Sequence, residues 1–269
     1  MKKLLLLSAL LIFACSSEND DDNSSTCDVV YLDSNGVTVK TCPNANVGDV
    51  GTINGINYTV VNREILNEML LNGDDVSIVC TSNITDMSYL FFDFANGEPY
   101  PFAIDFNQSI NSWDVSNVTN MQGMFMQAFL FNQPIADWDV SNVNDMLTMF
   151  KNASEFNQPI DNWDVSSVLN MGGMFFCQQN FNQPLDNWDV SSVTNMSSMF
   201  KGSMSFNQPI GNWDVSNVSS MAYMFNQNEV FNQNLSNWDV SNVIICSQFS
   251  NNTSQWTLPQ PNFTNRNPN

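Results

Sequence analysis

The chain has 269 residues, which is enough for one or two globular domains or for one array of repeats. It is acidic, with 27 Asp and Glu against 7 Lys and Arg, so it lacks the basic surface that nucleic-acid binding requires and would be repelled by an anionic membrane surface. It also lacks His, the commonest general base and metal ligand, and this absence argues against an enzyme.

The first element in chain order is a targeting segment, "MKKLLLLSALLIFAC". Two Lys precede an apolar run over 4–14 that is too short to cross a bilayer, so residues 1–14 are predicted to be a signal peptide. The small residue followed by Cys15 resembles the lipobox of bacterial lipoproteins, which implies cleavage before Cys15 and lipid on its sulfur. The alternative is an ordinary signal peptide with a chance cysteine.

The next segment, "SSENDDDNSST" over 16–26, contains no apolar residue and is expected to be a solvated tether. Together with Cys15 it forms a lipidated, acidic stretch over 15–26. An acidic run behind a lipidated Cys resembles the surface-export signal of Bacteroidetes lipoproteins. That resemblance implies a lipid-anchored protein of the bacterial outer membrane that faces the cell exterior, and a periplasmic spacer is the alternative.

Residues 27–78 are predicted to form an N-terminal capping segment for the repeats that follow. Cys27 and Cys42 lie 15 residues apart within it, and in an exported protein they could form a disulfide.

Internal repetition dominates the rest of the chain, over 79–250. Phe-Asn-Gln begins at residues 106, 131, 156, 181, 206 and 231, and Trp-Asp-Val-Ser begins at residues 113, 138, 163, 188, 213 and 238. Both motifs step by 25 residues, and a degenerate pass precedes them at 80–92. A fixed period of this length predicts a solenoid in which each repeat buries the apolar face of its neighbour.

Within one repeat the hydrophobic period changes. Trp113 and Val115 alternate with polar residues, as in a strand, whereas the apolar residues from Val118 to Phe125 follow helical spacing behind Ser116, a good helix N-cap. Each repeat is therefore predicted to be a short strand, a short helix and a return loop. Residues 251–269, which contain three Pro and break the period, are predicted to form a C-terminal cap.

The repeat pattern "FNQPIxxWDVSNVTNMxxMF" resembles the BspA-like bacterial surface-protein repeat, a mycoplasma-type domain of unknown function also found in Listeria and Bacteroidetes lipoproteins. That family is similar to leucine-rich repeats. The fold class expected is therefore α/β: a right-handed, leucine-rich-repeat-like solenoid of about seven 25-residue strand–helix repeats, capped at both ends. The resemblance implies adhesion or protein binding at the cell surface and supplies no catalytic residue.

The repeated Asp is the candidate binding face, because by strand alternation it points away from the core. Like charges on neighbouring strands repel, so something must offset the repulsion. Hydrogen bonds from turn N–H groups, Ser or Asn would do so, and a row of Ca²⁺ ions or simple exposure are the alternatives. The six residues are Asp114, Asp139, Asp164, Asp189, Asp214 and Asp239.

A second candidate recognition region is the set of segments that vary between repeats. They are expected to cluster along one edge, either as a specificity surface or as unconstrained loops, and they span 126–130, 151–155, 176–180, 201–205 and 226–230.

Taken together, the sequence predicts a non-enzymatic surface lipoprotein that binds an extracellular, host or neighbouring-cell protein in adhesion, with contact to the membrane through the lipid only. No nucleophile elbow, phosphate loop or metal-ligand spacing is present, so no cofactor is predicted. The alternatives are a polysaccharide-binding lipoprotein, which would need exposed Trp or Tyr, and a structural component of the cell surface.

Overall fold

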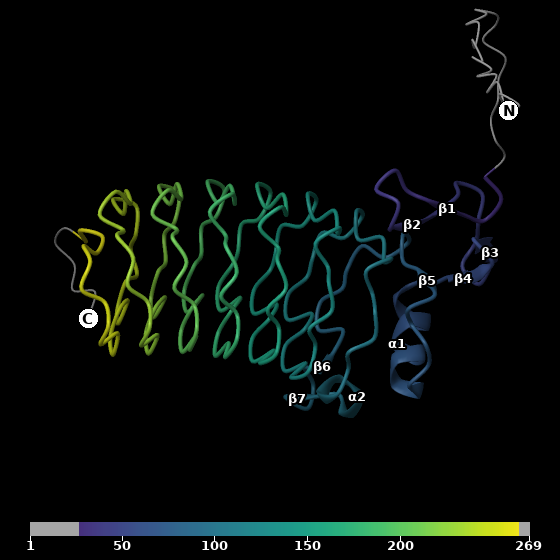
Figure 1. The fold of residues 1–269 in the computed structure, drawn as a ribbon, viewed down its shortest axis with the longest axis horizontal. Coiled ribbons are helices and arrows are strands. Elements are labelled where there is room, and N and C mark those ends of the chain that lie inside the picture. Colours follow the sequence, from purple (N-terminus) through teal and green to yellow (C-terminus); the bar gives the residue numbers. More distant parts are fainter. Residues whose placement is uncertain (1–26, 264–269) are drawn as a thin grey trace, which may run out of the picture.

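The computed structural model describes residues 27–263, and Figure 1 shows them as a row of coils stacked side by side behind an N-terminal segment. The predicted signal peptide, Cys15, the acidic tether and the last six residues of the predicted C-terminal cap lie outside the described residues.

The N-terminal segment contains regular secondary structure. Strand β1 (Val30–Leu32) pairs antiparallel with β2 (Val39–Thr41), and β3 (Val50–Ile53) pairs antiparallel with β4 (Ile56–Val60). Asn54 and Gly55 join β3 to β4 with φ angles of 51° and 81°, the conformation of a tight hairpin turn. A disulfide between Cys27 and Cys42, with Cα atoms 5.6 Å apart, ties the start of the segment to the residue after β2.

Helix α1 (Arg63–Asn72) connects this segment to the stack. Asn62 caps its N-terminus by accepting from the Ile65 N–H, and Gly73 ends it with φ 75°. The chain then returns as β5 (Val79–Cys80), which pairs parallel with β4. A short insertion follows at one rim of the first coils and contains β6 (Phe92–Asp93), β7 (Glu98–Pro99) and α2 (Pro101–Ile104) (Figure 1).

The predicted fold class, an α/β leucine-rich-repeat-like solenoid of strand–helix repeats, is wrong. Between α2 and residue 263 the structure contains neither a helix nor an extended strand, and each coil is a succession of turns. Neighbouring coils share one isolated parallel bridge each: Asp86 with Asn120, Asn120 with Asp145, Asp145 with Asn170, Asn170 with Asn195, Asn195 with Ser220, and Ser220 with Ile245.

The predicted helix of each repeat does not form, because many of its backbone N–H groups bond to the neighbouring coil. Over 121–128, alternate N–H groups donate to the next coil at 2.8 or 2.9 Å. Of those between them, Gln122 donates to the Asn120 side chain, and the other three donate to the carbonyl three residues earlier. A helix would need every N–H within its own segment. From residue 121 onward the alternation places two residues of each coil in the left-handed region, at 123 and 127 in one coil and at matching positions in the others. A right-handed helix cannot continue from that conformation.

The predicted strand around the Trp-Asp-Val-Ser block does not form for a related reason. The burial pattern alternates as predicted around Trp138 and Val140, but a turn closes on each side, from Trp138 N–H to Ile135 and from Val143 N–H to Val140. The cross-coil hydrogen bond at this place comes from a side chain instead. From Trp138 to Trp238 each indole N–H of the repeats donates to the carbonyl 28 residues earlier, as Trp163 does to Ile135 at 3.0 Å.

One hydrophobic core runs the length of the stack, from Val61 to Phe263. Two columns of Phe rings stack along it: Phe125 and Phe150 lie 5.5 Å apart between centroids, and Phe125 lies 4.1 Å from Phe131 in the same coil. Each such pair contributes about 0.5–1.5 kcal/mol beyond the burial of its area. The aromatic columns therefore set the position of each coil on the next.

The last coil is covered by residues that follow it. The Trp256 ring packs edge-on against Phe225 and Phe231, and Phe263 packs edge-on against Phe249. Because the edge-on rings replace the parallel stacking of the interior, the column of rings ends here.

Candidate functional site

The repeated Asp residues each close a local turn. Oδ1 of Asp139 accepts the N–H of Ser141 at 3.1 Å and its hydroxyl at 2.6 Å. The same N–H contact recurs at every repeat, for Asp114, Asp164, Asp189, Asp214 and Asp239. The Ser predicted to cap a helix is thus the donor to this carboxylate.

These hydrogen bonds favour the charged carboxylate. The Ser191 hydroxyl and N–H lower the pKa of Asp189, while burial and the neighbouring Asp214 oppose the shift. Ser216 lowers the pKa of Asp214 in the same way, and Ser241 lowers that of Asp239 chiefly through its N–H. At Asp189 and Asp239 the repulsion by Asp214 is therefore present but smaller than the local stabilisation.

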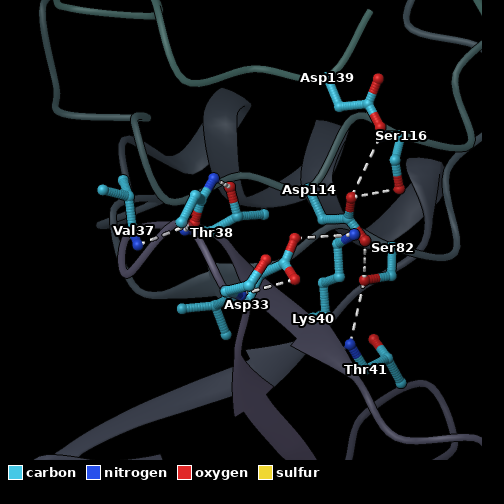
Figure 2. A network of polar contacts seen from close by, with 12 residues as sticks. Asp33, Val37, Thr38, Lys40, Thr41, Ser82, Asp114, Ser116 and Asp139 are labelled. Atoms are coloured by element: carbon cyan, nitrogen blue, oxygen red, sulfur yellow. Dashed lines mark hydrogen bonds and ion pairs between the residues drawn. The ribbon is translucent and has the colours of Figure 1, made fainter. Parts of the chain in front are cut away.

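The first member of the column differs from the rest because the N-terminal segment covers it. Asp114 is buried, and its second oxygen accepts the Ser82 hydroxyl at 2.5 Å, which in turn accepts the Thr41 N–H (Figure 2). Lys40 lies beside this network and is paired with Asp33 at 2.9 Å, which raises the pKa of Lys40. The remaining members are exposed.

The structure keeps these carboxylates in separate turns. Over residues 27–263, no three His, Cys, Asp or Glu side chains are grouped so that they could hold a metal ion. The arrangement therefore provides single carboxylates at successive coils rather than a polydentate site.

Two other constant residues are also used in building the stack. Oδ1 of Asn132 accepts the N–H of Asn157 at 3.0 Å and the side chain of Gln158 at 2.8 Å, so each Phe-Asn-Gln holds the next. The Trp column is buried, at 0–4% exposure from Trp113 to Trp238, and its ring faces stack on one another. These Trp residues are not available as a surface platform for sugars.

Three of the five variable segments, 176–180, 201–205 and 226–230, line one groove of about 650 Å³ together with Asn252 and Ser254. Its lining residues come from matching positions of four successive coils. One column contributes Cys177, Gly202, Gln227 and Asn252, and the other contributes Gln179, Met204, Glu229 and Ser254.

The first of these columns adopts the left-handed conformation throughout, with φ between 54° and 64°. This conformation lets the N–H groups of Cys177, Gly202 and Gln227 point toward the next coil, where each donates to a carbonyl at 2.8 or 2.9 Å. It also fixes where the following side chains emerge. The backbone is therefore the same in each of these coils, and only the residue type at the variable positions differs.

A cluster of aromatic and cationic side chains adjoins the groove and was not predicted. The Lys151 ammonium lies 5.2 Å from the centroid of Phe176, and the Lys201 ammonium lies 5.5 Å from the same ring and 4.8 Å from Tyr223. The available signal was the 25-residue step itself, which places Lys151, Phe176 and Lys201 in one column.

The cysteines of the stack carry thiols, and Cys177 is the one beside this cluster. Its side chain is partly buried, and burial raises the pKa of the Cys177 thiol while Lys201 and Lys151 oppose that shift. Cys80 is buried, and its thiol donates to the Val39 carbonyl at 3.2 Å. The thiol of Cys177 is thus the more accessible of these two.

No helix among the described residues is both long and apolar enough to cross a membrane.

Comparison with known proteins places most of the repeat region in one family. A family model described as "Mycoplasma protein of unknown function, DUF285" matches residues 61–183 and, overlapping with that range, 155–263. Neither a curated protein nor a solved structure matches the chain. The two matched ranges together cover well over half of the sequence, and the chain belongs to the DUF285 family of Mycoplasma-type proteins of unknown function.

Proposed function

We propose that the protein is a surface-exposed lipoprotein that acts as a non-enzymatic binding and adhesion module, with a protein as its ligand. The observation that carries this proposal is a difference between the constant and the variable residues of each coil. The constant Asn, Trp and Asp residues are occupied by neighbouring coils or turns, as Asn157, Trp163 and Asp164 show. The variable residues line a shared groove at the surface.

The anchoring part of the proposal rests on the sequence. Cys15 follows a short apolar run, and an acidic, solvated stretch follows Cys15. The resemblance of the repeats to BspA-like surface proteins supports adhesion as the role. A protein is favoured over a polysaccharide as the ligand because sugars bind to exposed aromatic faces, and the Trp column is buried.

The anchoring is tested in cells of a bacterium that processes lipoproteins. We expect Cys15→Ala to release the protein from the membrane fraction and to abolish its labelling by a fatty-acid analogue. Protease added to intact cells should degrade the unaltered protein. Protection of the protein in intact cells, with digestion only after lysis, would place it in the periplasm instead.

The binding role is tested with a pair of variants of the full chain in detergent. Met204→Asp alters the groove, where the Met side chain is 57% exposed. Asp164→Asn alters a constant residue of the repeat that does not line the groove. Surface proteins from candidate host or neighbouring cells are passed over each variant. We expect a captured protein to be lost with Met204→Asp and kept with Asp164→Asn. Equal loss with both variants, or self-association alone, would contradict the proposal.

A further inference from the structure

The repeat region contains two cationic side chains, and both belong to the cluster beside the groove. Over 79–250 the Lys and Arg residues are Lys151 and Lys201, which occupy the same position in coils that lie two apart. Phe176 holds that position in the coil between them, and both ammonium groups lie over its ring. The two charges are therefore no farther apart than the sum of their distances to one ring.

Neither ammonium group has a carboxylate partner among residues 27–263. The ion pairs there join Lys40 to Asp33 and Arg63 to Asp86. In a chain with 27 acidic residues, two adjacent cations without an ion pair are an available site for an external carboxylate. A carboxylate forms charge-assisted hydrogen bonds with an ammonium that are stronger than neutral ones.

The aromatic rings restrict the two Lys side chains before any ligand arrives. An ammonium over an aromatic face is attracted to the negative face of the ring. Holding a long side chain in place removes part of the conformational entropy that binding would otherwise cost. The pair is thus prepared for a ligand that carries two nearby negative charges.

Two residues of the groove follow residues of this cluster directly in the chain. Phe176 and Lys201 are followed directly by Cys177 and Gly202, the first lining residues of one column of the groove. Beyond them the groove offers amide side chains at Gln179, Gln227 and Asn252, an exposed apolar side chain at Met204, and a single carboxylate at Glu229.

We propose that this edge binds an extended, acidic peptide segment of a partner protein. Its carboxylates pair with Lys151 and Lys201, its backbone lies against the amide side chains, and an apolar side chain packs on Met204. Glu229, in the third of the four coils that line the groove, disfavours further acidic residues away from the two Lys, so the segment is acidic at one end only. This inference rests on the proposed function and names the partner chemistry for its groove.

The overall negative charge of the chain does not prevent such binding. At physiological ionic strength charges are screened beyond about 8 Å, so most of the acidic residues act weakly at the cluster. The two ammonium groups act at contact distance. The distant charges slow the approach of an acidic peptide more than they weaken the bound complex.

The test uses a displayed library of random octapeptides, selected on the full chain purified in detergent. Selected sequences are then synthesised with blocked termini and their affinities measured. We expect enrichment of Asp or Glu toward one end of the peptides. The double variant Lys151→Gln with Lys201→Gln should weaken binding at least about tenfold, whereas both Lys→Arg replacements should retain it. Lys40→Gln, which removes a distant positive charge, should leave the affinity unchanged.

Cys177 provides a readout confined to the groove. Its reaction with a thiol reagent, followed by mass spectrometry of the fragment that carries it, should slow when a selected peptide is bound. Peptides without acidic enrichment, no selected peptide at all, equal affinity for the double variant, or an unprotected Cys177 would each overturn the inference. So would an oligo-uronate that protects Cys177 in a Lys-dependent way where the peptides do not. A partner protein captured equally by the double variant would overturn the inference alone and leave the proposed function standing.

Discussion

The N-terminal segment and the coil stack hold their chains together by different means. Over 30–80 the backbone pairs in strands and forms one capped helix, and side chains mainly cover those elements. From residue 106 onward, side chains form columns that connect the coils: indole N–H to carbonyl, Asn to backbone, and ring on ring. In a periodic sequence, side-chain contacts that recur from coil to coil can therefore take the place of helices and strands.

The two regions should therefore respond differently to loss of a side chain. In the N-terminal segment the backbone hydrogen bonds survive a truncation. In the stack a truncation breaks a link on both sides of the altered coil, because each column residue contacts both neighbours. Substitutions at matched burial in the two regions test this difference directly.

The largest effect is expected for Trp163→Ala. The change removes a buried ring and leaves the Ile135 carbonyl without its indole donor. Truncation of a buried aromatic typically costs about 3–5 kcal/mol of unfolding free energy. The measurement is chemical denaturation followed by circular dichroism, and Phe94→Ala, at a ring that is 70% exposed, is the control. A loss of unfolding free energy no larger than that of the control would contradict a stabilising role for the Trp column.

The second effect concerns the Asn column. Asn157→Ala removes an oxygen that accepts the Asn182 N–H at 3.1 Å and the Gln183 side chain at 3.0 Å. Leaving a partly buried donor unpaired costs about 1–3 kcal/mol. Gln179→Ala, at an exposed amide of the next coil, should cost much less in the same denaturation experiment. Equal stability of Asn157→Ala and the unaltered protein would show that water replaces the column.

A third, smaller effect separates backbone strain from crowding in the two regions. Gly173 and Gly36 both have positive φ, at 59° and 72°, but a Cβ at Gly173 would lie 3.1 Å from Thr148, whereas one at Gly36 would meet nothing within 4 Å. Each Gly→Ala change should cost about 1–2 kcal/mol through the left-handed backbone. Thermal melting should show a greater loss at Gly173, and a greater loss at Gly36 would contradict the tighter packing of the coils.

The smallest effect is a dependence on pH that belongs to the stack. The folded pKa values of Asp189 and Asp214 are lowered from the ordinary value of 3.8 by their Ser partners. A lowered carboxyl pKa stabilises the fold above the unfolded value, and that contribution is lost as pH falls through the folded value. Stability should thus decrease below about pH 4. Asp189→Asn should make this decrease shallower, and an unchanged pH profile in melting experiments would contradict the assignment.

The sequence predicts the register of the stack but not its backbone. The 25-residue step of Trp-Asp-Val-Ser and the burial of Trp138 and Val140 could be inferred, because periodicity and apolar alternation are written in residue types. The helix was wrong because the spacing from Val118 to Phe125 fits any compact turn that buries every third or fourth residue.

The left-handed residues that interrupt the predicted helix could not be recognised from residue type. Gly marks some of them, as at Gly123 and Gly173, but Thr148 and Ser198 occupy the same position in other coils. Residue type therefore did not identify the conformation. The neighbouring coil imposes it, since the N–H groups on that side bond to the next coil rather than within a helix.

The candidate site was predicted only in part. The shared edge of the variable segments follows from the period. The Lys151 and Lys201 cluster required knowing that side chains one coil apart touch, which depends on the coil-to-coil distance. The repeated Asp stood out in the sequence because of its constancy, and the structure accounts for that constancy by the turn each Asp closes with the Ser two residues later.

The alternate N–H groups have a consequence for how this chain can evolve. Every interior coil presents the same row of donors on one side and the same row of acceptors on the other, so any two coils are interchangeable at their junction. Duplication or loss of one 25-residue unit in the gene creates no new kind of contact. The stack can therefore gain or lose whole coils while the segments that cover its two ends stay as they are.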